Sequence, residues 1–461
     1  MSFIRYLLSF LVSLGILVSP AAHYTPLEGR EFTDGEIDVI DSENEYIKME
    51  ITDVGYDIFN PDAEKGGYRY GPTLFVNADG SIDAFFACPG RGGQWDWISY
   101  KHSPDGGKTW TDEKSVLQPT PDSPDFYSCC DPGVVKFGEY YYIGYTSTVN
   151  VNGTDNNVFV ARSKNIDGPY EKWNGNGWGG RPQAIVDYTG NPDRFGAGEP
   201  SFIVLDDTLY LYYTWLDDNG RTTRVSIADA TDENWPATLE YKGVAFASPD
   251  SSSDSADVKY VDDYGKFIAV ATNKRFTADS FVDVFVSDDG ITFERSYATK
   301  TDTAICCHNC GISGRSNGHI RLSDGVYFAY AYGDVWANWP TRLSKVELSL
   351  IAQPDLSDAE NKNLNIPVTY AEEDLYANYI GIVCKPAHYT KSVDDGAFLP
   401  EILLVEDCMD TVRLLTGVTF EDYDESVIKF VGTLAIPQGV GETFVTVKYR
   451  DMQTLMFIEI H

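Results

Sequence analysis

Two stretches decide the fold: CCDPGVVKFGEYYYIGYTS, from Cys129 to Ser147, and GAGEPSFIVLDDTLYLYYTW, from Gly196 to Trp215. Each opens with an acidic residue before proline, continues as a hydrophobic run, turns at a short polar step and returns as a tyrosine-rich run. Aromatic and β-branched residues on both sides of a short turn are typical of an antiparallel hairpin. Looser versions of the pattern occur in three other places, which indicates an internal repeat of roughly 50 to 70 residues.

The repeat units begin near Tyr68, Cys129, Gly196, Ser255 and Asn309. In each unit the hairpin is followed by outer runs, so that a complete unit supplies four antiparallel strands. A single sheet of this kind cannot bury both of its faces, and copies arranged around an axis cover one another. Five units therefore predict a five-bladed β-propeller over residues 65–351.

Two of the outer turns resemble a known fastening turn. SPDGGKTW, from Ser103 to Trp110, matches the Asp-box pattern S-x-D-x-G-x-T-W, and SDDGITF, from Ser287 to Phe293, is a looser copy. In such a turn the aspartate accepts backbone hydrogen bonds and the aromatic ring packs beneath it. We interpret both turns as structural and not catalytic.

The segments on either side of the repeats do not show the repeat pattern. Residues 1–22 carry one cation, Arg5, an apolar run and small residues up to Ala22, which is typical of a secretory signal peptide; an uncleaved anchor is the alternative. Residues 23–64 are a lead-in segment, and 352–365 form a polar linker. Residues 366–461 hold short alternating runs that predict a small immunoglobulin-like β-sandwich for spacing or attachment. The predicted fold class is all-β.

Charge excludes some partners. The chain has 70 acidic and 35 basic residues, a formal net charge of -35 and a pI near 4.3. Such a field repels phosphate backbones and anionic lipid surfaces, so we expect no nucleic-acid partner and no membrane insertion after the signal is removed. We expect a secreted, extracellular monomer.

Export permits disulfides among the eight cysteines. The stretch ICCHNC, ending at Cys310, lacks the two separated ligand pairs of a zinc finger, so we expect disulfides or buried thiols in preference to a metal. Cys384 and Cys408 lie apart from the other six and could pair with each other.

Acidic residues near the start of three repeats carry the functional prediction. A propeller gathers these strand starts at one end of its channel, which would bring Asp131, Glu199 and Asp257 together. Converging carboxylates suit glycoside hydrolysis, in which one carboxyl group donates a proton and another activates water or attacks carbon. The alternative is that each merely accepts backbone hydrogen bonds, but three in register favour function.

These motifs, DPGVVKFGEYYYIGYTS, GAGEPSFIVLDDTLYLYYT and DVKYVDDYGKFIAV, resemble those of five-bladed propeller glycosidases. The resemblance covers about residues 65–350 and is greatest to glycoside hydrolase family 43 and the related fructan-hydrolysing families. It implies an Asp base, a Glu acid and a second Asp that tunes the acid, with inversion of configuration. These roles fall on Asp131, Glu199 and Asp257. In the family the base belongs to the first blade, whereas here that blade opens with Gly71-Pro72.

The resemblance also implies a histidine in the channel, here His308, beside water or a metal ion. No cofactor is required, although a structural calcium ion in the central channel is possible. Calcium prefers oxygen ligands, so His308 would reach it through water. Sugars need flat apolar faces and polar groups, which predicts further substrate-binding residues at the mouth of the channel. These are Arg69, Trp95, Asp96, Trp97, Tyr127, Arg194 and Trp336.

We therefore expect a secreted hydrolase of a plant or microbial oligo- or polysaccharide. Arabinan, xylan side chains, fructan and galactan-type sugars all fit. One alternative is a noncatalytic carbohydrate-binding surface propeller. Another is a sialidase-like hydrolase, suggested by the Asp-box, but such enzymes resemble six-bladed propellers with several arginines around a carboxylate.

Overall fold

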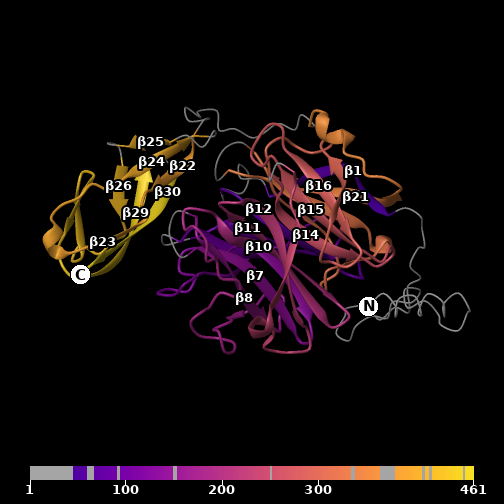
Figure 1. Cartoon of the computed structure of the whole chain (residues 1–461), viewed down its shortest axis with the longest axis horizontal. Coiled ribbons are helices and arrows are strands. Elements are labelled where there is room, and N and C mark those ends of the chain that lie inside the picture. The colour runs from indigo at the N-terminus through magenta and orange to yellow at the C-terminus, as the bar shows by residue number, and fades with distance from the viewer. Residues whose placement is uncertain are drawn as a thin grey trace, which may run out of the picture.

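The computed structural model describes residues 45–59, 67–90, 94–148, 153–249, 252–333, 338–363, 379–406, 411–414, 418–449 and 452–461. Strands dominate these ranges, where the helical elements are short 3-10 turns (Figure 1). The all-β class is therefore confirmed. Within these ranges, no helix has the length and apolar character that crossing a membrane requires.

Antiparallel strand pairing divides residues 70–351 into five successive units, the blades of a propeller. Blade one holds β2 (Tyr70–Val76), β3 (Ile82–Pro89), β4 (Asp96–Ser103) and β5 (Lys114–Leu117). Blade two holds β6 (Cys130–Phe137), β7 (Tyr140–Thr148), β8 (Asn156–Ser163) and β9 (Glu171–Lys172). Blade three holds β10 (Gly196–Leu205), β11 (Thr208–Asp217), β12 (Gly220–Asp229) and β13 (Glu240–Phe246). Blade four holds β14 (Asp254–Val261), β15 (Lys266–Asn273), β16 (Phe281–Ser287) and β17 (Glu294–Thr299). Blade five holds β18 (Cys307–Ile312), β20 (Val326–Tyr332), β21 (Thr341–Ile351) and the N-terminal β1 (Tyr46–Phe59).

The innermost strands close a ring. Strands β2, β6, β10, β14 and β18 contact one another in that order, and β18 returns to β2. Among the described residues, a separate hydrophobic cluster fills each of the five junctions between neighbouring blades. Each sheet is covered by its neighbours on both faces, so the blades stabilise one another. The channel that these strands surround carries the candidate site.

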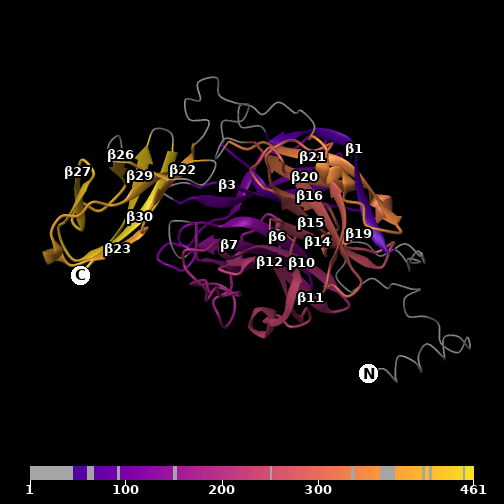
Figure 2. The ribbon, with the colours of Figure 1, turned by 45° about the horizontal axis from the view of Figure 1, so that its top comes forward.

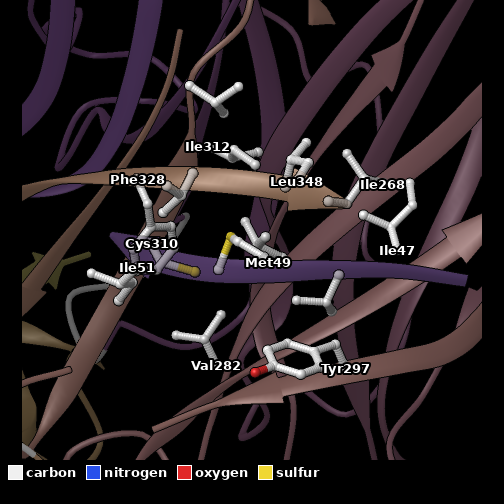
Figure 3. Packing of buried hydrophobic residues seen from close by; sticks show 14 of the residues in the cluster. Ile47, Met49, Ile51, Ile268, Val282, Tyr297, Cys310, Ile312, Phe328 and Leu348 are labelled. Atoms are coloured by element: carbon white, nitrogen blue, oxygen red, sulfur yellow. The ribbon is translucent and has the colours of Figure 1, made fainter. Parts of the chain in front are cut away.

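Strand β1 completes blade five. It pairs antiparallel with β21, with Met49 opposite Leu348, and so supplies the outermost strand from the opposite end of the repeat region. Ile47 and Met49 are fully buried, and Figure 3 shows β1 running between Leu348 and Ile312 on one side and Val282 on the other. The sequence analysis left these residues in a lead-in segment. The alternation of apolar residues in IKMEI fits a strand, but the local sequence pattern does not predict which distant strand it pairs with.

Both Asp-box turns act as predicted. In the first, Asp105 accepts a hydrogen bond of 2.8 Å from the backbone N-H of Thr109. In the second, Asp289 accepts from the backbone N-H groups of Ile291 and Thr292, at 2.7 and 2.9 Å. The hydrogen bonds from Thr109 lower the pKa of Asp105.

Residues 379–461 form a separate β module beside the propeller (Figure 2). One sheet holds β22 (Tyr379–Cys384), β24 (Ile402–Glu406) and β25 (Thr411–Leu414). A second holds β23 (His388–Lys391), β30 (Met452–Ile460), β29 (Gly441–Tyr449) and β26 (Val418–Glu421), and β27 (Ile428–Val431) pairs with β28 (Leu434–Pro437). Residues of these sheets share one hydrophobic core. The immunoglobulin-like assignment stays a prediction.

The cysteines within the described ranges are buried, and no disulfide joins them. Burial raises the pKa of the Cys88, Cys307 and Cys384 thiols to about 12, so they remain protonated and unreactive. Cys408 lies outside the described residues, so its pairing with Cys384 stays a prediction.

Candidate active site

The innermost strand of every blade carries a two-residue irregularity at the same level of the channel. The strand registers shift at Gly71-Pro72, Asp131-Pro132, Glu199-Pro200, Ser255-Ala256 and His308-Asn309. The first residue of the pair has a positive φ in blades one to four: Gly71 at 58°, Asp131 at 49°, Glu199 at 54° and Ser255 at 52°. This conformation is costly for residues other than glycine and concentrates at functional sites.

A cavity of about 560 Å³ opens above these irregularities and takes residues from all five blades. Its aromatic lining comprises Tyr68, Tyr70, Trp95, Phe195, Phe276, His308 and Trp339. Its ionisable lining includes Asp96, Asp131, Glu199, Arg221, Asp254, Lys274 and Arg275. Flat rings beside a few convergent charged groups are the pattern of a site for a polar ligand that has apolar faces.

Glu199 is 4% exposed and is held by both neighbouring blades. Its backbone N-H donates to Thr146 Oγ1 at 2.7 Å, and its Oε2 accepts from the backbone N-H of Ser255 at 3.1 Å. Burial, together with the negative charge of Asp254, raises the pKa of Glu199 to about 8. At neutral pH this carboxyl group therefore holds its proton.

Asp131 lies across from Glu199 in the preceding blade. Asn309 Nδ2 lies 3.4 Å from Asp131 Oδ1 and 3.3 Å from Glu199 Oε1, so that one amide contacts both carboxyl groups. The pKa of Asp131 is raised overall, because burial raises it more than the charge of Arg275 and the hydroxyl group of Thr146 lower it. Donated hydrogen bonds favour the ionised form, which is the form that can accept a proton from water.

Asp96 adds a third buried carboxyl group from blade one. Tyr68 donates its hydroxyl to Asp96 Oδ1 at 2.6 Å. Burial, together with the negative charge of Asp131, raises the pKa of Asp96 to about 7, although the hydrogen bond from Tyr68 lowers it. The negative charge of Asp131 therefore opposes the ionisation of Asp96.

Arg275 connects the acidic groups. Its Nη1 lies 2.9 Å from Glu199 Oε1 and 2.7 Å from Asp254 Oδ2. Arg221 Nε lies 3.2 Å from the other oxygen of Asp254. Although burial alone would raise it, the two guanidinium groups lower the pKa of Asp254. The charge of Asp254 raises the pKa of Glu199, while the two guanidinium groups keep Asp254 ionised, so the proton stays on Glu199.

His308 lines the cavity as a neutral ring. Arg275 Nε donates to His308 Nδ1 at 2.9 Å, which leaves the ring proton on Nε2. Burial, and then the charge of Arg275, lowers the pKa of His308 well below its usual value. The ring stacks on Tyr70 at 4.9 Å and meets Trp339 edge-on at 4.4 Å.

The surroundings of His308 do not fit a calcium ion. In the described part of the chain, no group of three or more His, Cys, Asp or Glu side chains is arranged to hold a metal. The guanidinium group of Arg275 lies beside His308 and the carboxyl groups of Glu199 and Asp254, where its charge would repel a second cation.

The structure brings five of the predicted residues to the cavity: Asp131, Glu199, Trp95, Asp96 and His308. Asp257 does not reach it. This residue comes directly after the irregularity, two positions beyond Ser255, and lies below the cavity in the narrow part of the channel. It pairs with Lys259, accepts from Ser201 Oγ at 2.8 Å and accepts from the backbone N-H of Ile312 at 2.9 Å. Its interactions are those of a structural residue that joins blades three, four and five.

Four other predicted binding residues lie elsewhere. Arg69 pairs with Glu113 at 2.7 Å and covers the Phe59 ring. Arg194 pairs with Asp218 at 2.7 Å on the surface. Trp97 and Tyr127 do not line the cavity either: Trp97 Nε1 donates to Gln94 Oε1 at 2.7 Å, and Tyr127 lies behind Trp95. Trp336 falls outside the described residues.

The sequence analysis missed Asp254, Arg275, Tyr70 and Trp339, which line the cavity. Asp254 could have been found from the sequence by counting residues back from the hairpin turn of each repeat. Asp131, Glu199 and Ser255 each stand six residues before the last paired residue of their hairpin strand, at Phe137, Leu205 and Val261. That alignment places Ser255 in register with the two acids and puts Asp254 immediately before it.

No model of a known protein family matches the chain, and no curated protein matches it. Among solved structures it is similar to Zg3597, a family 117 glycoside hydrolase from the marine bacterium Zobellia galactanivorans, with a TM-score of 0.46 and 16% identity over 67% of this chain and 92% of that one. It is also similar to the α-L-arabinofuranosidase PaAbf62A from Podospora anserina, with a TM-score of 0.45 and 15% identity over 67% and 98%. A thermostable family-43 glycoside hydrolase has a TM-score of 0.40 and 12% identity over 66% and 95%.

At these identities and scores the likenesses say nothing about catalysis, which depends on the side chains of the cavity.

Proposed function

We propose that this chain is an exported glycoside hydrolase in which Glu199 is the general acid and Asp131 the general base. One observation carries the proposal. Two buried carboxyl groups from consecutive blades meet at one asparagine in an aromatic-lined cavity, and the pKa of one of them, Glu199, is raised to about 8. An acid that is protonated at neutral pH beside an ionised base is what glycosidic bond cleavage requires.

The surrounding charges divide the two roles. Asp254 keeps its negative charge next to Arg221 and Arg275 and so holds the proton on Glu199. Glu199 then gives that proton to the leaving oxygen of the glycoside. Asp131, with hydrogen bonds from Thr146 and Asn309, takes a proton from the attacking water. Asp254 thereby takes the tuning role that the resemblance placed on Asp257. Attack by water in one step inverts the anomeric carbon.

The cavity walls suit a sugar. Trp95, Tyr70 and Trp339 present aromatic rings, and C-H faces of sugars pack on such rings while their hydroxyl groups bond to the charged groups between them. The ligand is an oligo- or polysaccharide, bound by a monomer outside the cell. A sialidase-like clamp is not favoured, because Arg221 and Arg275 are both engaged by carboxyl groups of the chain.

Turnover on a panel of chromogenic glycosides and polysaccharides tests the proposal, with NMR of the first-released anomer. Glu199→Gln and Asp131→Asn should each lower kcat roughly 10²- to 10⁴-fold and leave sugar binding intact. The loss from Glu199→Gln should shrink on nitrophenyl glycosides, whose leaving oxygen needs little protonation. Glu139→Gln, at an exposed glutamate paired with Lys164, is the control. Sugar binding without any turnover by the unaltered protein would instead establish a noncatalytic propeller.

A further inference from the structure

The sheet β23-β30-β29-β26 of the C-terminal module packs one face into the core of the module and has its other face covered in part. On one face Val445, Val447 and Met456 are fully buried in the core of the module. Because side chains alternate along a strand, Phe444 and Leu455 point to the opposite face. Leu455 is nevertheless only 7% exposed, and Tyr127 of the propeller belongs to the cluster that covers it.

A propeller segment between blades one and two provides that cover. The Phe126 ring lies 4.7 Å from the Phe444 ring. Tyr127 shares one buried cluster with Leu455 and Ala387 of the module, and it is 1% exposed. Residues of the C-terminal module therefore complete the apolar surroundings of Tyr127.

The same segment holds a wall of the cavity. The Trp95 ring stacks on the Tyr127 ring with centroids 5.3 Å apart, and the Trp95 backbone N-H donates to the Tyr127 carbonyl oxygen at 2.9 Å. Two residues further on, the Cys129 N-H donates to the carbonyl oxygen of Asp96 at 2.9 Å. Trp95 and Asp96 line the cavity, whereas Tyr127 stands behind them.

We propose that the C-terminal module is part of the substrate site: Phe444 and Leu455 fix Tyr127, and Tyr127 holds Trp95 in position as a wall of the cavity. Tyr127, Phe444 and Leu455 are positioning residues. The identity of the ligand as a sugar rests on the proposed function, but the positioning of Trp95 does not. An aromatic wall that is ordered before binding spares the ligand the cost of ordering it.

The test uses the full chain labelled with 5-fluorotryptophan, in which Trp95→Phe assigns the Trp95 resonance in the ¹⁹F NMR spectrum. Phe444→Ala and Leu455→Ala should each shift or broaden that resonance. Each should raise KM about threefold to tenfold and leave kcat within about twofold of the unaltered protein, as expected for one loosened side chain. Phe444→Leu and Leu455→Val should do the same more weakly if the alanine variants fail to fold.

Phe430→Ala is the matched control, because Phe430 stacks on Phe420 at 3.9 Å within the same module but on β27. It should leave the Trp95 resonance unchanged. An unchanged Trp95 resonance in the folded interface variants overturns the inference. A resonance that responds in a protein that neither binds nor cleaves any sugar supports the positioning and overturns the proposed function, so the two failures are distinguishable.

Discussion

Arg275 and Asp254 form the ion pair on which the chemistry of the cavity depends, with Nη1 2.7 Å from Oδ2. The same nitrogen lies 2.9 Å from Glu199 Oε1, so one cation serves two carboxyl groups. Asp254 also has Arg221 beside it, whereas Arg275 is the one cation that pairs with Glu199 among the described residues. The negative charge therefore settles on Asp254, and the proton settles on Glu199.

Asp254→Asn tests this arrangement through the pH profile of kcat. Glu199 acts while protonated, so activity should fall as the pH rises through its pKa of about 8. The charge of Asp254 raises that pKa, and its removal should move the alkaline limb to lower pH by about one unit. Asp218→Asn, on the surface beside Arg194, should leave the limb in place. An alkaline limb that stays or moves upward would show that Asp254 does not hold the proton on Glu199.

Thr146→Val tests the other limb. The hydroxyl group of Thr146 lowers the pKa of Asp131, so its loss should raise that pKa. Asp131 acts while ionised, and the acidic limb of kcat/KM should therefore move to higher pH. Thr214→Val is a matched control, since this buried threonine of β11 has a hydroxyl group with no hydrogen-bond partner in the described structure. Equal shifts in both variants would argue against the assignment of Asp131 as the base.

The repeat in the sequence was sufficient to predict the five blades and two acidic residues of the cavity, Asp131 and Glu199. Polar turns between tyrosine-rich strands mark each hairpin, and the proline after Asp131 and Glu199 marks the irregularity that aims them at the cavity. In blade four the corresponding pair is Ser255-Ala256, which has neither an acid nor a proline. The sequence analysis took the nearest acidic residue, Asp257, which lies two residues after Ser255. A count back from the hairpin turn would have identified Ser255 as the position equivalent to Asp131 and Glu199.

Other parts of the site had no signal in the sequence. Arg275 stands in a loop after β15, where no repeat pattern predicts the direction of a side chain. Its role depends on its contacts with Glu199 and Asp254, which come from two different strands. Strand β1 is similar: its apolar alternation indicates a strand, but its partner β21 lies at the far end of the repeats. Tertiary pairing over such a distance is not encoded in local periodicity.

Asp257→Asn should separate stability from catalysis. Asp257 pairs with Lys259, which is 3% exposed, and its removal leaves a buried cation without its counter-charge. We expect the free energy of unfolding, measured in urea, to fall by about 3 kcal/mol or more. Turnover of the folded fraction well below the unfolding transition should stay close to normal. A large loss of kcat in a variant of undiminished stability would return Asp257 to the catalytic machinery.

Met49→Ala tests whether β1 fastens the ring of blades. Met49 is fully buried between blades four and five, opposite Leu348 on β21 (Figure 3). Deleting its side chain opens a cavity at that junction, and the free energy of unfolding should fall by about 2–5 kcal/mol. Glu50→Ala removes the exposed neighbour on the same strand and should change stability by less than about 0.5 kcal/mol. If both variants unfold at the same urea concentration as the unaltered protein, the junction is stable without β1 and the ring is closed by the innermost strands alone.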